Sequence, residues 1–176
     1  MPESTLDVPA DISFEKAIAL CNTLLKKMAS SEISPSDVER TISDLVKTTN
    51  GARGFFVSYL PSEGTLADHP SPEVVQALRS HPDTVAELLA KNVAMSAAMV
   101  LTHRRNGNEE MALSSERVRD RTSNLIKLVN LPAVYSCCRE IYQSATTGEG
   151  NYKAFLERWG YDQEQRQLMS QVLQQF

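Results

Sequence analysis

The chain has 176 residues, of which 41% are hydrophobic and 23% are charged, and its formal net charge is −4. This length and composition fit a soluble globular protein with one core, and the negative charge offers no general attraction to nucleic acid or anionic lipid. Three cysteines are too few for a disulfide scaffold and favour a reducing compartment. We therefore expect a cytoplasmic protein that binds neither nucleic acid nor membrane.

The first helices are expected after a short N-terminal segment. Residues 1–11 are acidic and lack both a basic start and an apolar run, so we predict a disordered segment rather than a signal peptide. Apolar residues then recur at helical spacing over 14–28 and again over 38–46. The pair Asn50-Gly51 predicts the end of the second helix.

The next segment, GARGFFVSYL at residues 51–60, is rich in residues that favour strands. A strand would need a partner for its backbone, and no second strand candidate is evident. As a helix, the segment would place Phe56 and Tyr59 on one face, so we favour a short helix or a packed extended segment that buries the aromatic side chains. Arg53 is too polar to be buried unpaired, and we expect its guanidinium to meet a carboxylate, a helix C-terminus or an anion.

Helical periodicity continues to the C-terminus. Residues 88–101 are apolar or small on nearly all sides, which is typical of a helix in the middle of a bundle, and this stretch is too short to span a bilayer. Further helices are expected over 111–129, 131–145, 152–159 and from residue 162 onward. We therefore predict an all-α, single-domain bundle of about seven to nine helices over 12–176, with a central apolar helix near 83–105.

Few residues point to catalysis. The sequence has no glycine-rich phosphate loop, dinucleotide fingerprint, HExxH motif, nucleophile elbow or zinc-type cysteine pair. His69 follows Asp68 in the irregular loop at 61–72 and could act as a base or ligand, but no third partner is visible. His103 follows Met99 by one helical turn, a spacing that suits a cofactor pocket but is more often core. We assign no catalytic residue, cofactor or metal, and lean towards a protein that is not an enzyme.

Arginines gather where two predicted helices meet. The stretch HRRNGNEEM contains Arg104 and Arg105, and ERVRDR on the next helix contains Arg117 and Arg121. The pairs Glu116–Arg119 and Arg117–Asp120, each three positions apart, favour a solvated face of salt bridges. Alternatively, the arginines form a site for an anion or an acidic partner, because a guanidinium makes bidentate contacts to carboxylate and phosphate. Arg53, which stands between two glycines, could join that site.

Two functions follow from these residues. The first is a non-enzymatic interaction or regulatory module that recognises another protein through its arginine-bearing junction and the loop at 61–72. The second is a protein that binds a small molecule or an anion, or an enzyme that acts on one, with a pocket near Arg53, His69, His103 and Arg104. A closed pocket larger than about 300 Å³ lined by these four groups would favour the second, and a flat charged surface the first. Self-association is left open.

Five blocks of the chain resemble a family of small, uncharacterised cyanobacterial proteins. The blocks are NGARGFFVSYL, LADHPSP, KNVAMSAAMVLTHRRNGNEEM, ERVRDRT and GEGNYKAFLERWGYD, so the resemblance extends over residues 50–162. This resemblance brings no established activity, so no functional residue is carried over from it. It implies a soluble, cytoplasmic protein of photosynthetic bacteria.

Overall fold

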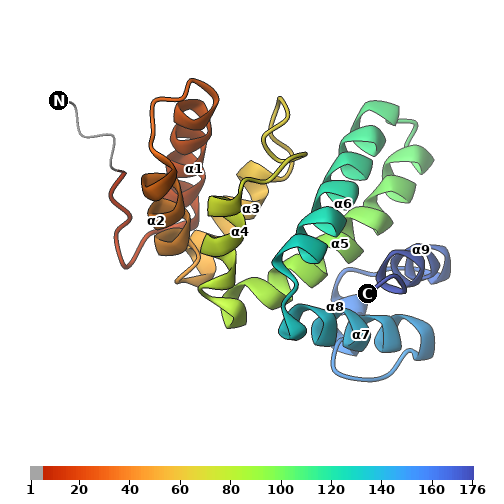
Figure 1. The fold of residues 1–176 in the computed structure, drawn as a ribbon. Helices are drawn as coiled ribbons and strands as arrows, with labels where there is room; N and C mark the ends of the chain where they lie inside the picture. Colours follow the sequence, from red (N-terminus) through yellow and green to blue (C-terminus); the bar gives the residue numbers. More distant parts are fainter. Residues whose placement is uncertain (1–5) are drawn as a thin grey trace. The chain divides into compact units, whose positions relative to one another are not determined.

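The computed structural model describes residues 6–176, which form nine α-helices and no strand (Figure 1). The all-α class, the number of helices and the long apolar helix are therefore confirmed. The described helices group into two compact units, Met1–Leu88 and Leu89–Phe176. The division into two units does not decide the number of domains, so the single domain expected over 12–176 remains a prediction. So does the disordered segment expected over 1–11, of which residues 1–5 lie outside the described part.

The first unit contains four complete helices and the beginning of a fifth. These are α1 (Phe14–Ala29), α2 (Pro35–Leu45), α3 (Thr49–Tyr59), α4 (Pro72–Arg79) and the first turns of α5 (Pro82–Arg105). Each of the four complete helices begins after a Ser or Thr whose side-chain oxygen accepts a hydrogen bond from a backbone N–H of the first turn. In this unit α1 packs against α3, and α2 packs against α4.

Residues 51–60 are helical, so one of the two favoured alternatives for this segment is confirmed. The helix α3 begins at Thr49, and the Thr48 hydroxyl accepts a hydrogen bond from the Gly51 N–H at 3.1 Å. The prediction that Asn50-Gly51 ends the second helix is wrong, because α2 already ends at Leu45. The Thr48 cap outweighs the turn tendency of this pair, which lies in the first turn of α3.

The aromatic side chains of α3 are buried. Phe55 stacks on Tyr59 with ring centroids 4.9 Å apart and meets Phe56 edge-on at 5.3 Å. The Tyr59 hydroxyl donates a hydrogen bond to the Leu66 carbonyl oxygen at 3.2 Å, which ties the following loop to this core. These rings explain why a segment with strand-like composition is stable as a helix: the tertiary core accommodates them on one face.

Glycine at position 54 permits close packing of α3 on α1. A Cβ there would overlap the Ala17 Cβ and come within 3.0 Å of the Ala17 carbonyl carbon and the Ile18 nitrogen. Gly51 is also closely approached, in its case by the Leu45 carbonyl oxygen. Gly51 and Gly54, on either side of Arg53, therefore serve helix packing.

The second unit contains the rest of α5 with α6 (Glu109–Val129), α7 (Pro132–Thr147), α8 (Lys153–Arg158) and α9 (Gln163–Leu173). Within it, α7 packs against both α8 and α9. Left-handed residues follow several of its helices, among them Asn130 after α6 with φ 48° and Gly148 after α7 with φ 75°.

The helix α5 is the longest of the described helices and contains a strongly apolar stretch. Its 24 residues are enough to cross a membrane by length and composition, although its apolar part alone was expected to be too short. However, 56% of its most apolar 18-residue window is buried inside the protein, as in the core helix of a soluble protein. Leu89, Ala90, Val93 and Ala94 are completely buried, which agrees with the predicted central helix.

Candidate functional site

Arg104 bridges the junction between α5 and α6. Its guanidinium forms ion pairs with Glu109 at 3.1 Å and with Glu116 at 2.7 Å. The hydrogen bonds that Arg104 donates to these carboxylates, first to Glu109 and then to Glu116, raise the pKa of Arg104. All three side chains are partly or largely exposed, so these ion pairs orient the junction more than they stabilise it.

Arg105 joins the end of α5 to the start of α9. It forms ion pairs with Asp162 at 2.6 Å and with Glu164 at 3.0 Å. The hydrogen bond from Arg105 lowers the pKa of Asp162, whose carboxylate also caps α9 by accepting from the Gln165 N–H. The Gln165 side chain donates in turn to the Thr102 hydroxyl at 2.6 Å. The charge of Arg105 is therefore matched within the chain.

The other predicted arginines differ in exposure. Arg117 is exposed on α6, whereas Arg121 is buried, with 5% of its surface exposed. His103 is half-buried in the last turn of α5. A buried Arg121 cannot take part in an exposed arginine surface, so the structure brings the predicted residues of this region only partly together.

Arg53 and His69 belong to the first unit. The Arg53 side chain is exposed and lies over the Phe14 ring, with its Cζ 4.7 Å from the ring centroid. The carboxylate expected for Arg53 is not found among the described residues, and a cation–π contact takes its place. His69 is exposed in the loop after α3, where its backbone N–H donates to the Thr65 carbonyl oxygen at 3.1 Å.

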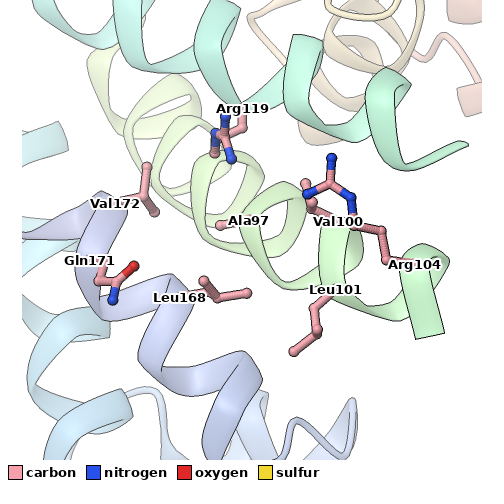
Figure 2. Close-up of a pocket in the computed structure, with 8 residues that line it drawn as sticks. All are labelled: Ala97, Val100, Leu101, Arg104, Arg119, Leu168, Gln171 and Val172. Carbon is pink, nitrogen blue, oxygen red and sulfur yellow. The ribbon is translucent and has the colours of Figure 1, made fainter. Parts of the chain in front are cut away.

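An open groove of about 490 Å³ lies in the second unit (Figure 2). Its apolar lining comes from two helices: Ala97, Val100 and Leu101 on α5, and Leu168 and Val172 on α9. Its polar lining consists of Arg104, Arg119 and Gln171. Figure 2 shows the two guanidiniums on the side of α5 and α6, and Gln171 on the opposite wall. Of the predicted site residues, Arg104 alone lines this groove.

Arg119 was missed by the sequence reasoning. Its Nε donates to Asp120 at 3.0 Å, and its two Nη atoms form no hydrogen bond or ion pair with residues 6–176. The motif ERVRDR contains three arginines, and helical spacing alone does not decide which of them faces α9. Arg119 is therefore the groove cation whose donors remain available, because Arg104 already serves two glutamates.

The described residues offer little for metal or thiol chemistry. No group of three or more His, Cys, Asp or Glu side chains within 6–176 could hold a metal ion. Burial raises the pKa of the Cys21 thiol and of the Cys138 thiol to about 12. Both thiols are therefore protonated near neutral pH, and a protonated thiol is a poor nucleophile.

The sequence matches the model of a protein family. No curated protein and no solved structure matches the chain. A family model described as "Uncharacterised conserved protein UCP020893" matches residues 13–176. This span includes all the described helices and every candidate site residue. The chain therefore belongs to this family of uncharacterised conserved proteins.

Proposed function

We propose that the protein is a non-enzymatic interaction module whose groove between α5 and α9 binds an amphipathic helix of another protein. The observation that carries this proposal is the pairing of an apolar groove with the available Nη atoms of Arg119. A helix that lays its apolar face in such a groove, with a carboxylate directed at Arg119, would satisfy both features.

The shape and lining of the groove support a helical ligand. Leu101, Leu168 and Val172 are half-buried, so each keeps apolar surface that a partner could cover. Burial of that surface would supply the affinity, at about 25 cal/mol for each Å² removed from water. The groove is lined mostly by apolar side chains, which suits the apolar face of a helix better than a polar small molecule.

Charge supports a carboxylate on that helix. Arg119 offers two donors in a planar fork, the arrangement that matches a carboxylate. Arg104 lies on the same side of the groove, but a partner would compete there with Glu109 and Glu116. Arg119 should therefore contribute more than Arg104 to the choice of partner, and binding should weaken with added salt.

The pocket alternative receives less support. Of the four groups proposed to surround a small molecule, only Arg104 lines this groove, while Arg53 and His69 belong to the first unit. The loop at 61–72 remains a proposed second contact of the module. A cytoplasmic location and a cyanobacterial source are further parts of the proposal, supported by the resemblance of the five sequence blocks. Fractionation of a cyanobacterium expressing the tagged chain would test the location.

Selection of peptides tests the groove. A displayed library of peptides of about 15 residues is selected against the whole protein, and the enriched peptides are titrated by calorimetry. We expect sequences with apolar residues at i, i+3 and i+4 and an adjacent Asp or Glu. Leu168→Lys should abolish their binding and Arg119→Gln should weaken it by about tenfold. Leu128→Lys is the matched control, because Leu128 is an exposed leucine on α6 outside the groove.

Two results would refute the proposal. One is enrichment of peptides that lack this pattern. The other is equal binding of the enriched peptides to the wild type and to Leu168→Lys.

A further inference from the structure

A second hollow of the second unit is polar. It has a volume of about 630 Å³ and lies between the end of α7 and the start of α9. Its polar side chains include Thr146, Thr147, Tyr161, Gln163, Arg166 and Ser170. No carboxylate is among the side chains that line it, although the chain as a whole is acidic. This lining favours a ligand with negative charge, because the one charged group is a cation.

The turn between α8 and α9 places Tyr161 in this pocket. The Gly160 N–H donates to the Glu157 carbonyl oxygen at 3.1 Å, and the Tyr161 N–H donates to that of Leu156 at 3.3 Å. This pair of bonds is a Schellman motif, and Gly160 supplies the left-handed residue that it needs, with φ 65°. The Tyr161 ring then meets the Phe155 ring edge-on at 6.3 Å. Tyr161 is thus fixed by its backbone and by its ring.

The Tyr161 hydroxyl has no partner in the described part of the chain. Only 7% of the Tyr161 surface is exposed, and its hydroxyl forms no hydrogen bond with residues 6–176. Within residues 6–176, the fully buried side-chain oxygens that lack a hydrogen-bond partner are those of Thr41 and Ser58. The Tyr161 oxygen is not one of them, so it must be in contact with solvent. Because Tyr161 lines the pocket, its hydroxyl is available to a molecule bound there.

Arg166 supplies two further donors. Its Nε donates to the Tyr161 carbonyl oxygen at 3.0 Å, which fixes the guanidinium beside the tyrosine. Its two Nη atoms form no hydrogen bond or ion pair with the described residues. A guanidinium held in this way presents a fork to an oxyanion without first losing the freedom of its side chain.

The rest of the lining favours a hydroxylated ligand. The Thr146 hydroxyl donates to the Tyr142 carbonyl oxygen at 2.9 Å, and the Ser170 hydroxyl donates to that of Arg166 at 2.8 Å. With their protons engaged, these oxygens can accept hydrogen bonds but not donate them. The C-terminal end of α7 adds partial negative charge. A bare anion would satisfy the donors and leave these acceptors unused, whereas ligand hydroxyls would pair with them.

We propose that this pocket binds a small oxyanion that also carries several hydroxyl groups, such as a sugar phosphate or a sugar acid. The oxyanion meets Arg166 and the Tyr161 hydroxyl, and the ligand hydroxyls meet Thr146 and Ser170. Burial raises the pKa of Tyr161 to about 12, so the phenol remains a donor at neutral pH. This site is separate from the α5–α9 groove, and its ligand does not depend on the partner proposed there.

The probes are glucose-6-phosphate, gluconate, inorganic phosphate and glucose, each titrated into the ¹⁵N-labelled protein and followed by NMR. We expect glucose-6-phosphate or gluconate to shift the amide signals of residues 145–148 and 161–170. Inorganic phosphate should bind more weakly, and glucose most weakly, because each supplies only part of the contacts. The stronger of the first two probes identifies the type of oxyanion.

Substitutions locate the site. Arg166→Gln should weaken binding by about tenfold, and Tyr161→Phe by about threefold or more, because each removes donors to a charged group. Arg139→Gln is the matched control, since Arg139 is exposed on α7 and does not line the pocket. Tyr161→Phe keeps the ring packing, so it tests the site even if Arg166→Gln disturbs the fold.

Three results would overturn the inference. The first is the absence of shifts in both segments with all four probes at millimolar concentration. The second is an affinity for inorganic phosphate equal to that for the stronger of glucose-6-phosphate and gluconate. The third is unchanged binding of that stronger probe by Tyr161→Phe.

Discussion

Replacement of Gly54 by alanine tests the close packing of α3 on α1. The new Cβ would overlap the Ala17 Cβ and approach the Ala17 carbonyl carbon and the Ile18 nitrogen to 3.0 Å. Two of these obstacles are backbone atoms and the third is a Cβ, so none can move aside by rotation of a side chain. The two helices must therefore separate locally.

The size of the effect follows from two opposing terms. Overpacking in a well-filled core costs about 1–3 kcal/mol, and the rigid obstacles place Gly54→Ala near the upper end. Alanine in place of glycine in a helix recovers about 1 kcal/mol. We therefore expect a net loss of about 2 kcal/mol in the free energy of unfolding, measured by urea titration with circular dichroism.

A second substitution separates steric overlap from other causes. Ala17→Gly removes the obstructing Cβ, so the double variant should show a favourable coupling of about 1 kcal/mol. Ala19→Gly is the matched control, because Ala19 is exposed on α1 and reports the cost of glycine in that helix alone. Stability of Gly54→Ala equal to the wild type would refute the reasoning. So would simple additivity of the Gly54 and Ala17 substitutions.

Four further predictions concern stability. Phe56→Ala should lower the free energy of unfolding by about 3–5 kcal/mol, because Phe56 is only 2% exposed; a loss below about 1 kcal/mol would contradict its place in the core. Leu89→Ala should cost about 2–5 kcal/mol, and an unchanged melting temperature would show that α5 does not carry the core. Arg53→Ala should cost at most about 1 kcal/mol, since its cation–π contact is exposed, and unfolding as easy as that of Phe56→Ala would reveal a larger structural role. The hydrogen bond from Arg105 lowers the pKa of Asp162 in the folded state. The ionised carboxylate therefore stabilises the protein fully at pH values above its ordinary pKa of 3.8, and this stabilisation is lost as the pH falls through the lowered pKa. Urea titrations at several acidic pH values should therefore show a smaller loss for Asp162→Asn than for the wild type, and identical losses would contradict the ion pair.

Helix positions were largely predictable because their signals are local. Apolar spacing located the long helix near 83–105, and the structure places it at Pro82–Arg105. Such spacing and the capping of a first turn act within a few residues, so they can be read without knowledge of the fold. The segment 51–60 was harder, because its composition favours a strand. The Thr48 cap and the core that surrounds the aromatic rings of this segment stabilise it as a helix.

The candidate sites depended on contacts that span the chain. Arg104 and Arg105 were selected for their residue type, but the partners of Arg105 lie 57 and 59 positions further along. Arg119 was left out of the predicted site, which included its neighbours Arg117 and Arg121, and no local pattern pointed to Arg166. The sequence by itself determined the all-helical class and most helix positions, since those follow from interactions between near neighbours. Only the tertiary structure decided which guanidiniums are satisfied by carboxylates and which keep their donors, because that depends on how distant helices pack.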